Sequence, residues 1–206
     1  EAAKYGKKPG DIKRLDVNGD YKINSADAMV LGNMFPDYEM NLSTALSFRQ
    51  WELNVELQVV QGNEILQTST FTLEDRQWYA NSRGTLLKDA WTPTNQNTMV
   101  PAVRFGHTDP RGTDLTFFMD GHWIQDGSFI RGRNLTLAYN LPANGIGRLG
   151  FKNLRIYGNV QNFFLITKYT GFDPEVESFP GTFAQGIEFN PYPRPRTFTL
   201  GVNLNF

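Results

Sequence analysis

The most constraining feature of this sequence is its final stretch, residues 196–206, which reads RTFTLGVNLNF. Apolar residues occupy every second position, and small, uncharged polar residues lie between them: Phe198, Leu200, Val202, Leu204 and Phe206 against Thr197, Thr199, Gly201, Asn203 and Asn205. Because successive side chains of a strand point to opposite faces, this period predicts a β-strand with two different environments. A soluble barrel or sandwich would turn the apolar face inward. A membrane barrel would turn it to lipid and the polar face to a wet lumen.

The composition narrows the class of protein. The formal net charge of −1 is unlike the basic surplus of nucleic-acid-binding proteins, so we expect no nucleic-acid partner. Without cysteine, the sequence excludes a disulfide scaffold, a thiol nucleophile and a cysteine zinc site. Plentiful Gly, Phe and Tyr indicate a β-rich fold. No apolar run reaches the roughly 18 residues of a transmembrane helix, and no signal peptide is present. The chain opens with Glu-Ala-Ala, so we expect its start to be missing, processed or cut.

An oxygen-rich motif, DVNGDYKINSAD, occupies residues 16–27. Oxygen-bearing side chains fall at loop positions one, three, five, nine and twelve, and position seven would contribute its backbone carbonyl, as in loops that wrap calcium. The candidate ligands are Asp16, Asn18, Asp20, Lys22 and Asp27, with Asn24 at position nine. The motif departs from an EF-hand at Tyr21, where glycine is usual, and at Asp27, which replaces glutamate. It is also similar to one of the paired calcium loops of dockerin modules. An Asx-rich turn without an ion is the alternative.

The rest of the sequence predicts an all-β arrangement. Residues 1–37 form a polar loop that carries the calcium-like motif, and residues 61–126 and 166–195 form two long connections. A candidate short helix lies near residues 73–79. Alternation predicts five antiparallel strands, at about 38–48, 51–60, 127–141, 151–165 and 196–206.

The order of connection lengths favours the membrane barrel. The connections run short, long, short, long, and antiparallel strands place alternate connections at opposite ends, so both long loops share one end with the N-terminal loop. Outer-membrane barrels have short periplasmic turns and long extracellular loops, whereas compact soluble domains seldom contain such long structureless loops. Strands of about ten residues, rising ~3.3 Å each and tilted by ~45°, also cross an apolar band of ~25 Å. A soluble β-sandwich is the alternative.

Several stretches are similar to a known family. They read GDIKRLDVNGDYKIN, LGNMFPDYEMNLS, WTP, DGSFIRGRNLTLAYNLP, LRIYGNVQNFFLITKYTGFDPEV and YPRPRTFTLGVNLNF, at residues 10–24, 31–43, 91–93, 126–142, 154–176 and 192–206. In this order they resemble the C-terminal part of SusC/RagA-type TonB-dependent outer-membrane transporters. That resemblance implies a barrel of about twenty-two strands, of which this chain would supply roughly the last five. Because an open sheet edge in lipid leaves backbone groups unpaired, we expect the chain to be a fragment of a longer transporter.

The resemblance also implies a function. Such transporters import glycans or oligopeptides across the Gram-negative outer membrane and are not enzymes. Their implied partners are a SusD-like surface lipoprotein that acts as a lid, the TonB complex through the missing N-terminal region, and the lipid bilayer, in a dimer of SusC–SusD-like pairs. Two alternatives differ in class: a secreted calcium-dependent binding module, with a dockerin-like loop on a β-sandwich, and a passive porin.

Aromatic and histidine residues in the first long connection suggest further hypotheses. Trp78, Trp91 and Trp123 offer flat faces on which sugar rings stack, or they pack a small core of the loop itself. His107 and His122 are the two histidines of the chain, too few for a zinc site without cysteine.

Charged residues occur on the expected strands and in the second long connection. Arg131 and Arg133, at the outer end of the third strand, pair either with carboxylates of the loops or with anionic lipid headgroups. Residues 173–175, Asp-Pro-Glu, predict a turn that folds the second long connection back. Glu52 and Glu56 lie on one strand face, where a hydrophilic lumen wall explains them without catalysis.

Overall fold

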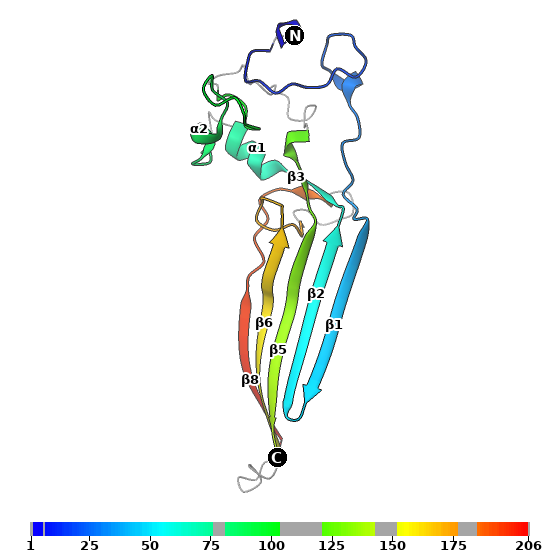
Figure 1. Ribbon diagram of the computed structural model, residues 1–206, viewed down its shortest axis with the longest axis vertical. Coiled ribbons are helices and arrows are strands. Elements are labelled where there is room, and N and C mark those ends of the chain that lie inside the picture. Colours follow the sequence, from blue (N-terminus) through cyan, green and yellow to red (C-terminus); the bar gives the residue numbers. More distant parts are fainter. Residues whose placement is uncertain are drawn as a thin grey trace. The chain divides into compact units, whose positions relative to one another are not determined.

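A computed structural model describes residues 2–5, 7–75, 81–103, 121–142, 152–176 and 185–205 (Figure 1). The chain divides into two compact units. The first, here the loop unit, comprises Glu1–Asn33, Ile65–Gln125 and Val176–Asn190. The second, the sheet unit, comprises Met34–Glu64, Asp126–Glu175 and Pro191–Phe206. The N-terminal segment thus groups with parts of both long connections.

The sheet unit contains one five-stranded antiparallel sheet in the order β1-β2-β5-β6-β8 (Figure 1). Its strands are β1 (Tyr38–Phe48), β2 (Trp51–Gln61), β5 (Phe129–Leu141), β6 (Asn153–Thr167) and β8 (Thr197–Asn205). The observed ends lie within about two residues of the expected ones, because period-two alternation runs along most of each strand. The antiparallel β-fold is therefore confirmed, although this chain alone does not close a barrel.

One irregularity interrupts the alternation where β5 pairs with β6. The register shifts between Gly132 and Asn134, and Asn162 on the opposite strand has a left-handed backbone with φ of 52°. A side chain at position 132 would collide with the rings of Phe163 and Phe164, so glycine is required there. This bulge explains why the apolar residues at the end of β6 break the period-two pattern.

A tight turn joins β1 to β2. Arg49 adopts a left-handed backbone with φ of 54°, and the amide of Asn140 on β5 donates to the carbonyl of Gln50 at 2.8 Å. Next to this turn, the rings of Trp51 and Tyr139 pack with centroids 4.7 Å apart. The turn is thereby fixed to the neighbouring strand.

Short elements make up the loop unit and its borders with the sheet unit. The strands are β3 (Glu64–Gln67), β4 (Ile124–Asp126) and β7 (Ile187–Glu188), which form a small sheet in the order β4-β3-β7. The helices are η1 (Ala2–Tyr5), η2 (Ser25–Asp27), α1 (Thr68–Asp75), α2 (Leu86–Asp89) and η3 (Gly121–Trp123). Helix α1 overlaps the start of the short helix expected near residues 73–79. No helix in the described ranges is long and apolar enough to cross a membrane.

A buried carboxylate organises the middle of the loop unit. Glu188 of β7 is completely buried, and its two carboxylate oxygens accept the amides of Ser69 and Asn190, each at 3.0 Å. The hydroxyl of Thr68 donates to the Glu188 carbonyl. A negative charge at a helix N-terminus satisfies free amides and complements the helix dipole, so Glu188 stabilises the start of α1.

Candidate functional site

The apolar row of each sheet strand lies on the outside of this chain. In β8, Leu200 is 89% exposed and Phe198 72% exposed. Val202 and Leu204 of β8 are exposed on the same face, together with apolar residues from all the other strands: Met40, Leu42, Leu46, Phe48, Trp51, Leu137 and Ile156. A β-sandwich would bury this face, so the arrangement contradicts the alternative of a soluble sandwich.

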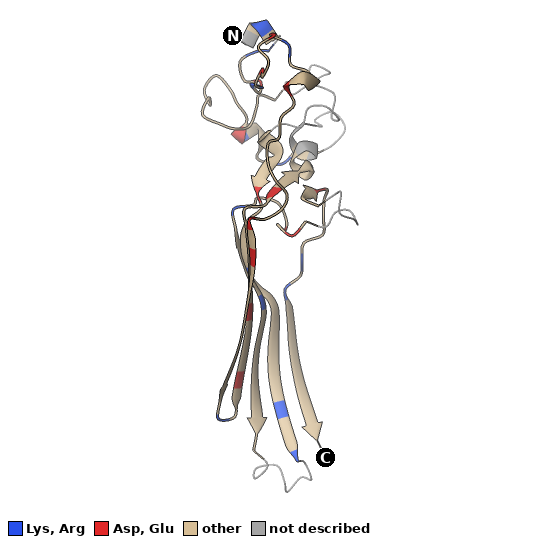
Figure 2. Ribbon diagram, turned by 90° about the vertical axis from the view of Figure 1, so that its right-hand side faces the viewer, with Lys and Arg blue, Asp and Glu red and all other residues tan. Residues whose placement is uncertain are grey.

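The opposite face of the sheet is polar and cross-linked by hydrogen bonds. Glu52 accepts from the amide of Asn140 at 2.7 Å and pairs with the Arg155 guanidinium at 3.1 Å. Gln58 donates to the Glu39 carboxylate at 2.6 Å. Charged positions are sparse along the strands (Figure 2). The bonds of Asn140 to Glu52 and of Gln58 to Glu39 connect neighbouring strands, and the Glu52–Arg155 pair reaches from β2 across β5 to β6. Such a face is suited to a water-filled lumen.

On this polar face, the ring of Tyr157 covers Gly201 of the terminal strand. Gly201 of β8 lies directly opposite Tyr157 of β6, and a Cβ atom at Gly201 would collide with the Tyr157 ring. Arg155 stacks over the same ring, with its guanidinium carbon 5.3 Å from the centroid. The glycine in the polar row is therefore explained by a close approach of an aromatic side chain.

The arginines at the outer end of β5 pair with loop carboxylates. Arg131 is 2% exposed, and its guanidinium lies 2.5 Å from Asp173 and 2.9 Å from Glu175. Arg133 also contacts Glu175, and Arg194 approaches it at 3.6 Å. Of the two readings, the structure has the pairing with loop carboxylates. The loop itself turns at Asp173, whose side chain accepts the amide of Glu175 at 2.9 Å.

The calcium-like loop is folded around its own backbone amides. Asp16 accepts the amides of Gly19 at 2.7 Å and Tyr21 at 2.8 Å. Asp27 accepts the amides of Val17 and Asn24, both at 2.9 Å. Three further candidates also accept backbone amides: Asn18 accepts that of Asp20, Asp20 that of Lys22, and Asn24 that of Ala26.

The backbone of this loop has two left-handed residues. Gly19 has φ of 77° and Tyr21 has φ of 63°. Tyr21 thus adopts the conformation that favours glycine at position six of an EF-hand loop, which costs a residue with a side chain about 1–2 kcal/mol. The motif's main departure from the calcium-loop pattern is therefore accommodated in the backbone.

Backbone hydrogen bonds in this loop lower the pKa of Asp27. The amide of Asn24, and those of Val17 and Asn18, hold the pKa of Asp27 below its ordinary value. Among the residues that the structure describes, no three His, Cys, Asp or Glu side chains are grouped to hold a metal. The calcium site stays a prediction, in which the ion would replace backbone amides as the partner of Asp16 and Asp27.

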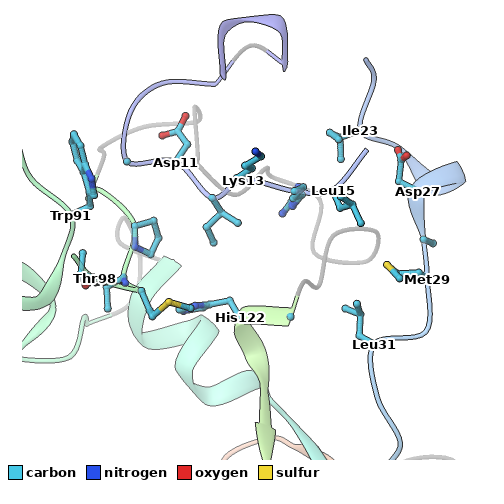
Figure 3. Close-up of a pocket in the computed structure, with 18 of the residues that line it drawn as sticks. Asp11, Lys13, Leu15, Ile23, Asp27, Met29, Leu31, Trp91, Thr98 and His122 are labelled. Atoms are coloured by element: carbon cyan, nitrogen blue, oxygen red, sulfur yellow. Dashed lines mark hydrogen bonds between the residues drawn. The ribbon is translucent and has the colours of Figure 1, made fainter. Parts of the chain in front are cut away.

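A pocket of about 730 Å³ lies beside this loop, within the loop unit. Figure 3 shows its labelled lining residues, which come from the N-terminal segment and from the first long connection. The lining is mainly apolar and includes Leu15, Met29, Leu31, Trp91 and Met99, with His122 at one side. Of the tryptophans, Trp91 lines the pocket, Trp123 is buried, and Trp78 lies outside the described residues, as do His107 and Phe206.

Known proteins with the same sequence pattern are TonB-dependent receptors. The receptor P3 of Formosa agariphila is 33% identical over 205 residues, which cover 96% of this chain and 19% of P3. The receptor P26 of the same organism is 35% identical over 206 residues, covering 96% of this chain and 20% of P26. The receptor SusC of Bacteroides thetaiotaomicron is 29% identical over 206 residues, covering 97% and 18%. No family model matches the chain.

The chain is homologous to a segment of the SusC/RagA-type TonB-dependent receptors. It spans about a fifth of the length of the curated relatives it matches. A solved structure, the RagAB peptide importer in its open-open state, superposes with a TM-score of 0.68 and 25% identity over 86% of this chain and 18% of that one. TonB-dependent receptors are outer-membrane β-barrel proteins that transport and do not catalyse. The homologous segment is therefore a part of an outer-membrane protein.

Proposed function

We propose that the intact protein imports glycans or oligopeptides across the outer membrane, and that this chain supplies the last strands of its barrel together with outer loops. The observation that carries the proposal is the two-faced sheet, with Phe198 and Leu200 exposed on one face and Glu52 paired with Arg155 on the other. A lipid-facing side and a wet lumen require this division. The homology to TonB-dependent receptors supports energy-driven uptake over a passive porin.

Orientation of the terminal strand is tested by a pair of substitutions in the full-length protein. Leu200→Arg places a charge toward lipid near the middle of β8, at a cost of roughly 2–4 kcal/mol, whereas Thr199→Arg places it toward the lumen. We expect Leu200→Arg to reduce the amount of heat-modifiable barrel in the outer-membrane fraction severalfold and Thr199→Arg to leave it nearly unchanged. Equal losses in the two variants would contradict the assignment of faces.

The transport activity is tested in cells that lack the gene. We expect uptake of one of two probes, tryptic peptides of casein or neutral oligosaccharides of plant polysaccharide, to be lost and to return with the wild-type gene. Removal of TonB should abolish the same uptake. Persistence of uptake without TonB would favour the porin, and unchanged uptake of both probes in the deletion strain would count against either transport function.

The proposed partners follow from the same homology. A SusD-like lipoprotein would cover the extracellular loops, and two such pairs would form a dimer. The RagAB importer, a solved structure similar to this chain, supports a two-component arrangement. Purification of the tagged receptor in mild detergent should recover one lipoprotein in equal amount, with a mass of two pairs. A receptor that purifies alone at full transport activity would contradict the partnership.

We further propose that the loop of residues 16–27 binds calcium. Its support is the spacing of Asp16, Asn18, Asp20 and Asp27 together with the left-handed backbone at Tyr21. Terbium, a calcium substitute, should show luminescence sensitised by Tyr21 in the purified receptor, and excess calcium should quench it. Asp16→Asn should abolish the signal, whereas Asp11→Asn, outside the loop, should not. Absence of any calcium-displaceable signal would sink this proposal.

A further inference from the structure

Five charged residues of the sheet unit form a cluster that the two-faced sheet does not require. We call it the arginine clasp, and its members are Arg131, Arg133, Asp173, Glu175 and Arg194. Arg131 is in register with Gln58 of β2, so its side chain belongs to the polar row. Of the five residues, Arg131 is the most buried, and it contacts both carboxylates.

The arginine clasp lies where the chain leaves the sheet unit and where it returns to it. Residues 176–190 belong to the loop unit, so the chain leaves the sheet unit directly after Glu175 and returns at Pro191. Glu175 contacts Arg131 and Arg133 of β5, and also Arg194, which follows the return. The Glu175 carboxylate therefore connects the segment before residue 176 and the segment after residue 190 to the same part of β5.

Further contacts hold the segment that leads from β6 into the clasp. The Thr167 hydroxyl donates to the Ser128 carbonyl at 2.8 Å and accepts the amide of Tyr169 at 3.0 Å. The Tyr169 ring lies against Gly171, where a Cβ atom would collide with it. The segment 169–175 is thereby packed back over the polar row of β5 instead of continuing the line of β6.

Charge burial explains why this arrangement is specific. A buried arginine loses its hydration, and only well-placed carboxylates compensate for that loss. Removing one partner leaves an uncompensated buried charge, so the segment cannot drift away from Arg131 without a large penalty. The half-exposed pair of Glu52 and Arg155 on the same polar face lacks this constraint, since water can solvate both groups.

We propose that Arg131 is a positioning residue of the transport path: through Asp173 and Glu175 it holds segment 169–175 against the polar face and fixes one wall of the lumen near its outer end. The part of this inference that concerns transport rests on the proposed function. The part that concerns the position of the segment does not, because it follows from the ion pairs alone.

The experiment uses the full-length receptor, purified in detergent for hydrogen exchange and expressed in the deletion strain for uptake. Arg131→Met should speed amide exchange in residues 168–176 at least tenfold and lower uptake of the casein peptides or oligosaccharides that the wild type imports. Arg131→Lys should be intermediate, because an ammonium cannot reproduce the two-point contact of a guanidinium. Arg155→Met, the matched control on the same face, should leave exchange in 168–176 unchanged.

A second pair of variants guards against misfolding of Arg131→Met. Asp173→Asn and Glu175→Gln keep the shape of each side chain, and each should also speed exchange in residues 168–176. Unchanged exchange in all the clasp variants overturns the inference. Faster exchange with undiminished uptake overturns the role in transport, and the proposed function then still stands. If the wild type imports neither probe, the proposed function fails, while the exchange data still decide whether Arg131 holds the segment.

Discussion

The sheet unit exposes the apolar row of its terminal strand, whereas the loop unit buries a small set of apolar side chains and leaves others, such as Leu87 and Met99, exposed. Leu200 of β8 is almost fully exposed, while Ile65 of β3 is 1% exposed, and Leu86, Ala90 and Val100 form a small buried cluster. Hydrogen bonds between strands hold the sheet in register, and under the proposed function lipid would take the place of a protein core. The loop unit instead depends on its own small core and on buried polar contacts such as those of Glu188. The two units therefore differ in which of their apolar side chains are buried.

The largest expected effect contrasts truncation in the two units. Ile65→Ala should destabilise the loop unit by about 2–5 kcal/mol, because it removes a buried side chain, whereas Leu200→Ala should cost far less. Hydrogen exchange of the full-length receptor in detergent measures both. We expect faster exchange in residues 65–75 for Ile65→Ala and no change there for Leu200→Ala. A larger effect of Leu200→Ala on its own unit would show that the apolar row is packed against protein.

A smaller effect tests the polar face of the sheet. Gly201→Ala forces the Tyr157 ring away and should destabilise the sheet by about 1–3 kcal/mol, as overpacking does elsewhere. Gly158→Ala is the matched change on the opposite face, where a new Cβ atom would meet only a Leu200 methyl at 3.4 Å. The temperature at which the barrel unfolds on a gel should fall for Gly201→Ala alone. Equal shifts would mean that the two faces are equally crowded.

The smallest effect concerns pH and the loop unit. Backbone amides, first that of Asn24, lower the pKa of Asp27 from its ordinary value of 3.8. Because the pKa of Asp27 is lower in the folded state, its ionised carboxylate stabilises the loop fully above pH 3.8. This stabilisation is lost as the pH falls through the lowered pKa. We expect cleavage by pepsin within residues 16–27 to rise in this acid range. In Asp27→Asn the cleavage should be rapid throughout, and an identical acid response of that variant would refute the assignment.

The sequence was sufficient to predict the sheet because its strands are long. Period-two alternation over nine or more residues leaves little freedom in register, since a shift by one residue would exchange the two faces. The strands β3, β4 and β7 have two to four residues each, too few for a period, and they were missed within the long connections. The sequence signal of β3 was the apolar pair Ile65 and Leu66 alone.

Contacts between charged residues far apart in the sequence were the part of the candidate site that was hardest to predict. Arg131 and Asp173 are separated by 42 positions, and the sequence alone left lipid headgroups as an equal partner. The bulge at Gly132 and the turn at Asp173 bring them together, and neither has a periodic pattern. The spacing of the calcium-like loop was visible at once, but the left-handed backbone of Tyr21 was not, because tyrosine rarely adopts it.

The cap that Glu188 provides for α1 has a consequence for the order in which the chain acquires structure. Ser69 and Glu188 are 119 positions apart, so α1 lacks its buried partner until most of the chain has been made. By then the residues of β1, β2, β5 and β6 have all been synthesised. The contact between Ser69 and Glu188 is thus expected to form late in this segment, and a chain that stops before Glu188 would leave α1 uncapped.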